Sequence, residues 1–214
     1  MSCMEITRSL FEAIQKGDLD QFIKLFRPEL FHCQDVTGLG TLLNDTFFLR
    51  ACRLGKTEIL TFLLSQTPPG NKIALINRHK NPEAKTGPFP LYLAIQEFHI
   101  HVFDLLIKNG ADLHQITETY GNSSAHVAAA QNRTTILAQL FSMGVDIDLP
   151  NHTQATPLYI ASTLGNKEII EMLLTYRVRI NHTESDFGYT ALHGAVLGGH
   201  EDSVKALLDA GADF

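Results

Sequence analysis

The sequence contains no tryptophan, only three cysteines among 214 residues, and no long uninterrupted apolar run. The cysteines (Cys3, Cys33 and Cys52) are odd in number and lack the spacing of a zinc site, so we expect free thiols in a reducing compartment. A membrane-spanning helix needs roughly 18 consecutive apolar residues, and none is expected here. The first residues also lack the basic stretch and apolar core of a signal peptide.

An excess of positive charge is absent as well. Seventeen Lys and Arg residues against 23 Asp and Glu residues give a net charge of −6. Because nucleic-acid binding requires a basic stripe that displaces counterions, this balance disfavours a nucleic-acid partner. The one local basic cluster is Lys72, Arg78, Lys80 and Lys85, which is thin support for such binding. The 44% hydrophobic and 19% charged content is typical of a globular protein.

The chain does contain a sequence pattern that recurs about every 33 residues. Its best copy reads Thr-Ala-Leu-His-Gly-Ala over residues 190–195, followed by Gly199-His200 and by Leu-Leu-Asp-Ala-Gly-Ala-Asp over 207–213. Related copies begin at 89, 123 and 156, so that successive starts are separated by 34, 33 and 34 residues. Two weaker copies begin near residues 8 and 46. Such periodic self-similarity indicates stacked structural repeats.

The pattern resembles the ankyrin repeat, whose Thr-Pro-Leu-His-x-Ala signature is nearly matched at 156–161 and 190–195. The resemblance implies an all-α solenoid of about six helix-turn-helix repeats with short finger loops, as a single domain over residues 1–214. A small residue at the sixth position lets two helices approach closely, and every copy has alanine there: Ala13, Ala51, Ala94, Ala128, Ala161 and Ala195. Gly110, Gly144 and Gly211 stand where the second helix of a repeat ends in a left-handed residue.

The chain departs from the regular pattern in several places. Arg177 stands where other copies have glycine, so we expect a local distortion there. The segment 65–88, rich in proline and glycine, predicts a long inserted loop. Gln21 and Lys24 replace apolar residues in the first copy, which is typical of a capped N-terminal end. The last residues, 211–214, stand where a further repeat or domain would begin, so we expect the chain to be part of a longer protein.

No constellation of residues predicts catalysis or metal binding. His126 and His193 fall at the motif position that the family uses to link neighbouring repeats, and His200 follows Gly199 in the usual way. The other histidines, such as His99 and His182, are expected at the solvent surface, and Cys52 in the core. The sequence lacks a phosphate-binding loop, a nucleophile elbow, a zinc-protease motif and a dinucleotide fingerprint. We therefore expect no catalytic residue, no cofactor, no metal and no enzymatic activity.

The candidate binding residues are those that the repeat does not need for packing. Some lie in the fingers just before a first helix, and others at the end of a first helix, where the resemblance places them on a concave face. Exposed aromatic side chains are frequent interface anchors, although these rings could instead pack against the next finger. The predicted partner-binding residues are Tyr120, Asn122, His152, Thr153, Phe187, Tyr189, Arg53, Gln96, Glu97 and Gln131.

The resemblance implies a protein–protein interaction module, an adaptor or scaffold that recognises a partner protein through the concave face. The alternative is the targeting arm of a larger multidomain enzyme or effector whose catalytic domain lies beyond residue 214. Neither interpretation includes nucleic acid or a membrane as a partner. The expected location is the cytoplasm, or the host cytosol if the chain is a bacterial effector.

Overall fold

The computed structural model describes residues 3–26, 47–77, 89–117, 119–184 and 187–213. The chain divides into two compact units, residues 1–112 and 113–214, and each is described by itself. The repeat start expected at 46, Cys33, and residues 78–88 of the expected loop lie outside the described residues. Within the described ranges the secondary structure is helical, apart from an isolated β-bridge between Ile116 and Ser123.

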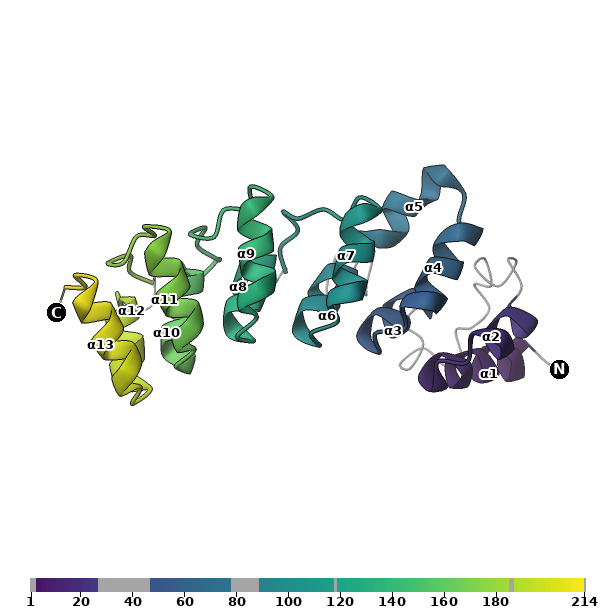
Figure 1. The fold of residues 1–214 in the computed structure, drawn as a ribbon, viewed down its shortest axis with the longest axis horizontal. Helices are drawn as coiled ribbons and strands as arrows, with labels where there is room; N and C mark the ends of the chain where they lie inside the picture. The colour runs from purple at the N-terminus through teal and green to yellow at the C-terminus, as the bar shows by residue number, and fades with distance from the viewer. Residues whose placement is uncertain (1–2, 27–46, 78–88, 118, 185–186, 214) are drawn as a thin grey trace. The chain divides into compact units, whose positions relative to one another are not determined.

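Unit 1 consists of helix pairs in which first helices contact first helices and second helices contact second helices. Its helices are α1 (Cys3–Lys16), α2 (Leu19–Leu25), α3 (Phe47–Arg53), α4 (Thr57–Gln66), α5 (Pro69–Ile76), α6 (Pro90–Gln96) and α7 (Ile100–Lys108). The first helices α1, α3 and α6 contact one another in that order, as do the second helices α2, α4 and α7. Figure 1 shows the successive pairs.

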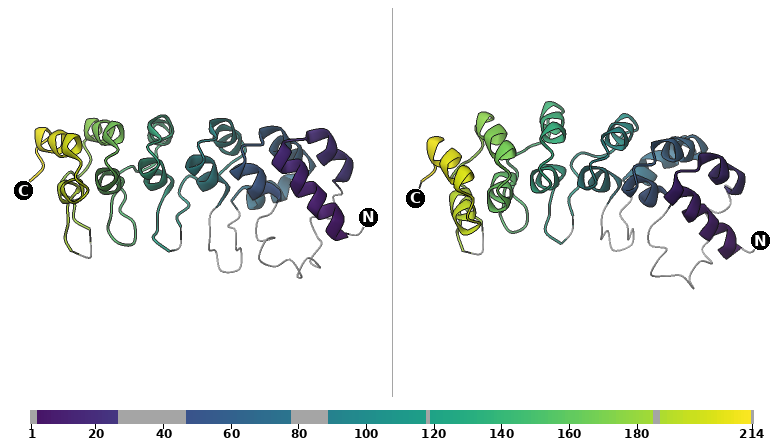
Figure 2. Two further views of the ribbon diagram at one scale, coloured as in Figure 1. Left: turned by 90° about the horizontal axis from the view of Figure 1, so that it is seen from below. Right: turned by 60° about the horizontal axis from the view of Figure 1, so that its bottom comes forward.

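Unit 2 repeats this arrangement with three pairs. Its helices are α8 (Ser124–Ala130), α9 (Thr134–Ser142), α10 (Pro157–Leu164), α11 (Lys167–Thr175), α12 (Ala191–Leu197) and α13 (Glu201–Asp209). The first helices α8, α10 and α12 form one layer, and the second helices α9, α11 and α13 form the other. The connecting loops, here called fingers, extend beyond the layer of first helices (Figure 2).

The alanines of the repeat pattern explain why the two helices of a pair lie so close together. All six, from Ala13 to Ala195, are fully buried. The second helices supply the larger apolar groups of the core: Val102, Phe103 and Leu106 of α7, for example, are buried. Cys52 is also fully buried, as expected for a small core residue. The core of each repeat is therefore shared between its own helices and its neighbours.

The first helices of unit 2 begin at hydroxyl-bearing residues. The Thr156 hydroxyl accepts a hydrogen bond from the amide of Tyr159 at 3.2 Å. Ser123 and Thr190 instead form reciprocal caps with a histidine three residues later, His126 and His193 respectively. These contacts satisfy backbone groups that a helix end leaves unpaired.

The second helices α7, α9, α11 and α13 are each followed by a left-handed residue, whereas α2 and α4 are followed by extended backbone at Phe26 and Thr67. Gly110, Gly144 and Gly211 have φ values of +90°, +83° and +89°. Arg177 holds the same place in α11's repeat and also adopts a left-handed backbone, with φ of +57°. The turn therefore has the same left-handed backbone without glycine. The distortion expected there is limited to the strain of a non-glycine residue with positive φ.

Part of the segment expected to be a loop is a helix. Residues 69–76 form α5, which begins with Pro69 at a position where a proline nitrogen needs no intrahelical partner. Ile76 of α5 is fully buried, and the next residue, Asn77, accepts a hydrogen bond from the amide of Asp112 at 2.8 Å. The expectation of a loop over 65–88 is therefore wrong for 65–66, which end α4, and for 69–76, where buried Ile76 and the bonds of Asn77 fix the stretch to the unit.

Some histidines expected at the solvent surface instead connect neighbouring repeats. The Nε2 of His99 donates to the carbonyl of Arg53 at 2.9 Å, and that of His182 donates to the carbonyl of Gln154 at 3.0 Å. His200 makes the equivalent contact to the carbonyl of Thr163 at 3.0 Å. His99 and His200 thereby satisfy carbonyls at the end of the first helix of the preceding repeat, α3 and α10 respectively. His99 and His182 are half-buried, so they do lie at the surface, but their rings bridge repeats, which was not expected.

Candidate functional site

The three fingers of unit 2 share one construction principle. In each finger the amide of the first residue donates a hydrogen bond to the carbonyl of the last: Thr117 to Asn122, Asn151 to Ala155, and Glu184 to Tyr189. In each finger the side chain of the first residue also accepts hydrogen bonds from backbone amides inside the loop. The fingers are thus held from within by hydrogen bonds of their first residues.

Glu184 organises the finger that precedes α12. Its side chain is buried, and its Oε1 accepts hydrogen bonds from the amides of Phe187 at 2.8 Å and Tyr189 at 3.1 Å. A carboxylate that binds two amides fixes the backbone of both aromatic residues. Their rings stack on each other with centroids 5.4 Å apart, and the Tyr189 ring stacks in turn on the His193 ring at 5.4 Å.

Phe187 is the most exposed large apolar side chain of the described residues, with 77% of its surface accessible. Next to it, Tyr189, Leu192, His193, Val196 and Leu197 line a shallow hollow of about 290 Å³. Val196 and Leu197 are 58% and 69% exposed. An apolar hollow beside a supported aromatic ring is the kind of surface that an interface buries.

The first two fingers of unit 2 are joined to each other. The amide of His152 donates to the carbonyl of Tyr120 at 2.8 Å, and the Asn151 side chain donates to that of Asn122 at 2.8 Å. The His152 ring covers Gly121 so closely that a Cβ there would lie 2.3 Å from the ring. Tyr120 remains 58% exposed. Hydrogen bonds therefore join the two fingers into one surface, and the Tyr120 side chain is exposed on it.

The predicted binding residues differ in exposure and in whether their polar groups are hydrogen-bonded within the chain. Thr153 is half-buried and donates both its amide and its hydroxyl to Asn151, while Asn122 is occupied by the contacts just described. Gln131 is exposed at the end of α8. In unit 1, Arg53 and Gln96 are half-buried at the ends of α3 and α6, and Glu97 is exposed.

Of the residues that line the hollow, only Tyr189 belongs to the predicted set, and Leu192, His193, Val196 and Leu197 do not. The sequence pattern predicts that His193 links repeats, yet its ring bonds to Thr190 and stacks on Tyr189, both of its own repeat, and it is exposed. Val196 stands at the position of Ala129 and Ser162, which are fully buried. Ile14 and Ile95 hold the same position in other repeats and are also fully buried, so the size of the residue at this position gives no signal of exposure.

His126 shows the contrasting, structural use of the same motif position. Its Nδ1 accepts from the amide and the hydroxyl of Ser123, and its Nε2 donates to the carbonyl of Ala155 at 3.0 Å, in the next finger. Burial lowers the pKa of His126 to about 4, although the carbonyl of Ala155 favours the charged form. The ring is therefore neutral at pH 7 and serves as a bridge between repeats.

The described residues offer no group of three or more His, Cys, Asp or Glu side chains able to hold a metal ion. Within the same residues, no helix combines the length and the hydropathy that crossing a bilayer requires.

Comparison with known proteins agrees with this architecture. The family model for ankyrin repeats (three copies) matches residues 49–151 and 125–214. Similar proteins include a probable E3 ubiquitin-protein ligase XBOS31 of Oryza sativa subsp. japonica, 30% identical over 59% of this chain, and a putative palmitoyltransferase ZDHHC13 of Danio rerio, 32% identical over 58%. The nuclear factor NF-kappa-B p105 subunit of Gallus gallus is 29% identical over 88%.

The matched regions are small parts of those proteins. They amount to 29%, 19% and 18% of the length of the rice, zebrafish and chicken relatives. What these relatives have in common with the chain is thus the repeat region. Ankyrin repeats are protein–protein interaction modules that present extended binding surfaces. The family match, the paired helices and the finger loops together show that the chain belongs to the ankyrin repeat family.

Proposed function

We propose that this chain is an adaptor that recognises a partner protein through the fingers and first helices of its repeats. Phe187 carries the proposal: it is an apolar ring left 77% exposed, stacked on Tyr189 and held by the buried Glu184 beside the hollow. Transfer of such a side chain from water into an interface stabilises a complex by roughly 1–2 kcal/mol.

The surface around Phe187 suits a protein ligand better than a small molecule. The hollow of about 290 Å³ is open, whereas small-molecule sites are enclosed clefts. The second exposed ring, Tyr120, and the exposed His152 and Gln131 lie on other repeats of the same unit. A ligand that contacts several repeats must be extended, as a folded protein or a protein segment is.

In unit 1 we assign Arg53, Gln96 and Glu97 to partner contacts by the same logic. They stand at the ends of first helices, as Gln131 does in unit 2. Their role is proposed from position in the repeat, because their side chains form no exposed apolar cluster comparable to Phe187 and Tyr189.

The test is affinity capture from cell lysate with three baits: the parent chain, a Tyr120→Ala/Phe187→Ala variant, and a Phe141→Ala control. Phe141 is a matched control because it is also an exposed aromatic, on the second helix α9, where its ring packs on Tyr176 at 4.1 Å. The proposal expects a protein that the parent and the control retain and the double variant loses. Equal retention by all three would assign the site elsewhere.

A second candidate function is that of a targeting arm in a larger enzyme. Two of the relatives carry the names of a ubiquitin ligase and a palmitoyltransferase, and the chain matches only 29% and 19% of their length. Both functions use the same binding surface. Sequencing of the native messenger RNA downstream of codon 214 separates them, since only the arm requires a catalytic domain in the same open reading frame.

A further inference from the structure

The third finger of unit 2 carries a stack of three rings whose backbone is bound by a buried carboxylate. The Phe187 ring lies on Tyr189 at an interplanar angle of 24°, and Tyr189 lies on His193 at 14°. Glu184 is only 8% exposed, and its Oε1 accepts from the amides of Phe187 and Tyr189. Phe187 is at one end of the stack and is 77% exposed. The free face of its ring is therefore open to a ligand.

A ring at the place of Phe187 stays exposed even where another finger follows. Tyr120 holds the same place in the first finger of unit 2, three residues before the N-cap of a first helix. The next finger is bonded to it, since the amide of His152 donates to the carbonyl of Tyr120 at 2.8 Å. Tyr120 is nevertheless 58% exposed. A neighbouring finger thus leaves a ring at this place accessible.

The fingers do not need a negative charge to keep their shape. In the second finger the neutral side chain of Asn151 does what Glu184 does in the third: its Oδ1 accepts from two backbone amides, those of Thr153 and Ala155, at 3.0 Å each. In the first finger the hydroxyl of Thr117 accepts from an amide at 3.0 Å. A buried carboxylate loses far more hydration than a buried amide or hydroxyl. The charge of Glu184 therefore indicates a role beyond holding the loop.

Unit 2 also carries the whole net negative charge of the chain. Residues 113–214 contain eleven Asp and Glu residues against five Lys and Arg residues, a difference of −6, whereas residues 1–112 contain twelve of each kind. Between residues 180 and 200 the sequence has two acidic residues, Glu184 and Asp186, and no lysine or arginine. A field of this sign attracts basic ligands and raises their rate of association.

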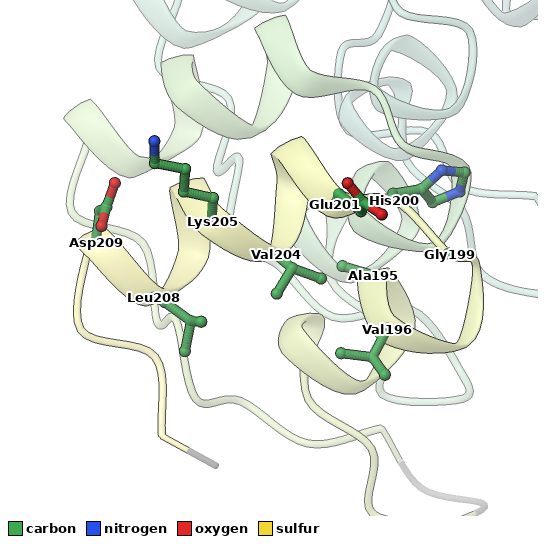
Figure 3. A pocket seen from close by; sticks show the side chains of 9 residues that line it. All are labelled: Ala195, Val196, Gly199, His200, Glu201, Val204, Lys205, Leu208 and Asp209. Atoms are coloured by element: carbon green, nitrogen blue, oxygen red, sulfur yellow. The ribbon is translucent and has the colours of Figure 1, made fainter.

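Helix α13 supplies further carboxylates to this part of unit 2. Val196 lines the hollow beside Phe187 and also a second hollow of about 460 Å³ (Figure 3). The charged side chains that line the second hollow are two carboxylates, Glu201 and Asp209, and one lysine, Lys205. Because the two hollows share Val196, the excess of carboxylates on α13 adds to the negative field beside Phe187.

We propose that Phe187 is a stacking platform for an arginine side chain of the partner protein. This rests on the proposed adaptor function and names the group of the partner that contacts Phe187. The guanidinium lies flat on the free face of the ring, whose π electrons attract a cation. The carboxylate of Glu184, bound to the amide of Phe187, attracts the same charge. Arginine fits better than lysine, because its planar group stacks on a ring whereas an ammonium is a strongly hydrated point charge.

The probe is the acetylated and amidated tripeptide Gly-Arg-Gly. The matched probe has citrulline in place of arginine, which keeps the shape and removes the charge. Each is titrated into the full nitrogen-15-labelled chain at one low salt concentration, and the amide signals of residues 187–189 are followed by NMR. The arginine peptide should shift them with a Kd on the order of 10 mM, and the citrulline peptide should bind at least about threefold more weakly. The amide of Phe141, an exposed aromatic on α9, should respond to neither.

Two variants separate the ring from the charge. Phe187→Leu keeps an apolar side chain and removes the ring, while Glu184→Gln keeps an acceptor for the two amides and removes the charge. Each should reduce the preference for arginine over citrulline to less than about twofold. The control Phe141→Leu should keep the full preference. The dispersion of the NMR signals shows whether each variant is folded, and Phe187→Leu, a change at an exposed site, decides the test if Glu184→Gln is not.

Three results would overturn the proposal. The first is equal binding of the two tripeptides to the parent chain. The second is a response at Phe141 as large as that at residues 187–189, which would mean unspecific attraction. The third is a preference for arginine that survives either Phe187→Leu or Glu184→Gln in the folded chain.

This test and the capture from lysate fail independently of each other. If arginine is not preferred but the Tyr120→Ala/Phe187→Ala bait loses the partner, the adaptor function stands and Phe187 is an apolar anchor. If arginine is preferred but that bait retains the partner, the ring binds a cation and the partner is recognised elsewhere, which contradicts both the finger site and its proposed arginine.

Discussion

Arg177 and Gly211 hold the same place at the ends of consecutive second helices, and both have a left-handed backbone, with φ of +57° and +89°. Glycine adopts this conformation without strain, whereas a residue with a Cβ loses about 1–2 kcal/mol in it. The repeat therefore imposes its turn geometry on Arg177 against the preference of the residue.

Replacement of Arg177 by glycine should stabilise the chain. The relief of strain exceeds the conformational entropy that glycine loses on folding, and a net gain of about 0.5–1 kcal/mol is expected in a urea melt. The control is Arg177→Ala, which removes the side chain and keeps the strain, so its stability should stay within about 0.5 kcal/mol of the parent. Equal stabilisation by both variants would show that the side chain, not the backbone, is responsible.

The stability of the chain should fall in mild acid because of His126. The pKa of His126 is about 4 in the folded chain and 6.5 as a free side chain, so the unfolded chain binds the proton more tightly. This contribution to stability is complete above pH 6.5 and is lost as the pH falls from 6.5 toward 4. Between pH 7.5 and pH 5 the loss from this one group is about 2 kcal/mol.

The measurement is a series of urea melts at several pH values for the parent and for His126→Gln. The variant lacks the titrating ring, so its stability should depend less on pH between 7.5 and 5, although it starts from a lower value. A parallel pH dependence in the two proteins would mean that other groups cause the loss.

Glu184 should control the shape of the third finger of unit 2. Glu184→Ala leaves the amides of Phe187 and Tyr189 without their acceptor, at a cost of about 1–3 kcal/mol. Glu184→Gln keeps one acceptor oxygen and should cost less. Hydrogen exchange should accelerate at these two amides in the alanine variant, and unchanged exchange there would show that other contacts hold the finger.

A pair of glycines tests the packing of His152 on its neighbouring finger. Gly121 and Gly144 both have a left-handed backbone, but a Cβ at Gly121 would meet the His152 ring at 2.3 Å, while one at Gly144 meets nothing within 4 Å. Gly144→Ala should cost about 1 kcal/mol of stability from backbone strain alone. Gly121→Ala should cost at least about 1 kcal/mol more, because the ring must move. Similar losses in urea melts would contradict this packing.

The sequence was sufficient to predict the helical repeat architecture because its signals are local and periodic. Buried alanines and turn glycines each depend on a few neighbouring residues, and the structure confirms them. The position of α5 was not predicted, because Pro68, Pro69 and Gly70 are typical of a loop and the burial of Ile76 depends on distant residues. The hydrogen bonds of His99 and His182 to neighbouring repeats were not predicted for the same reason, since their acceptors lie 46 and 28 residues away in the sequence.

The exposed surface of the unit 2 fingers was predictable only in outline. The positions of Tyr120 and Phe187 followed from the repeat register, but the support of Phe187 by Glu184 required the course of the finger. Likewise, Thr153 and Asn122 share the register of exposed residues, yet their polar groups are used inside the fingers. Register alone does not tell a contact residue from a residue that holds the loop.

Hydrogen–deuterium exchange of the chain, alone and with its captured partner, tests most directly whether the fingers bind. Recognition through the fingers predicts slower exchange at the amides of residues 119–122 and 187–189 when the partner is bound. The amides of α9 and α11, on the second-helix layer, should be unaffected. Protection confined to α9 and α11, with the finger amides unchanged, would contradict the account.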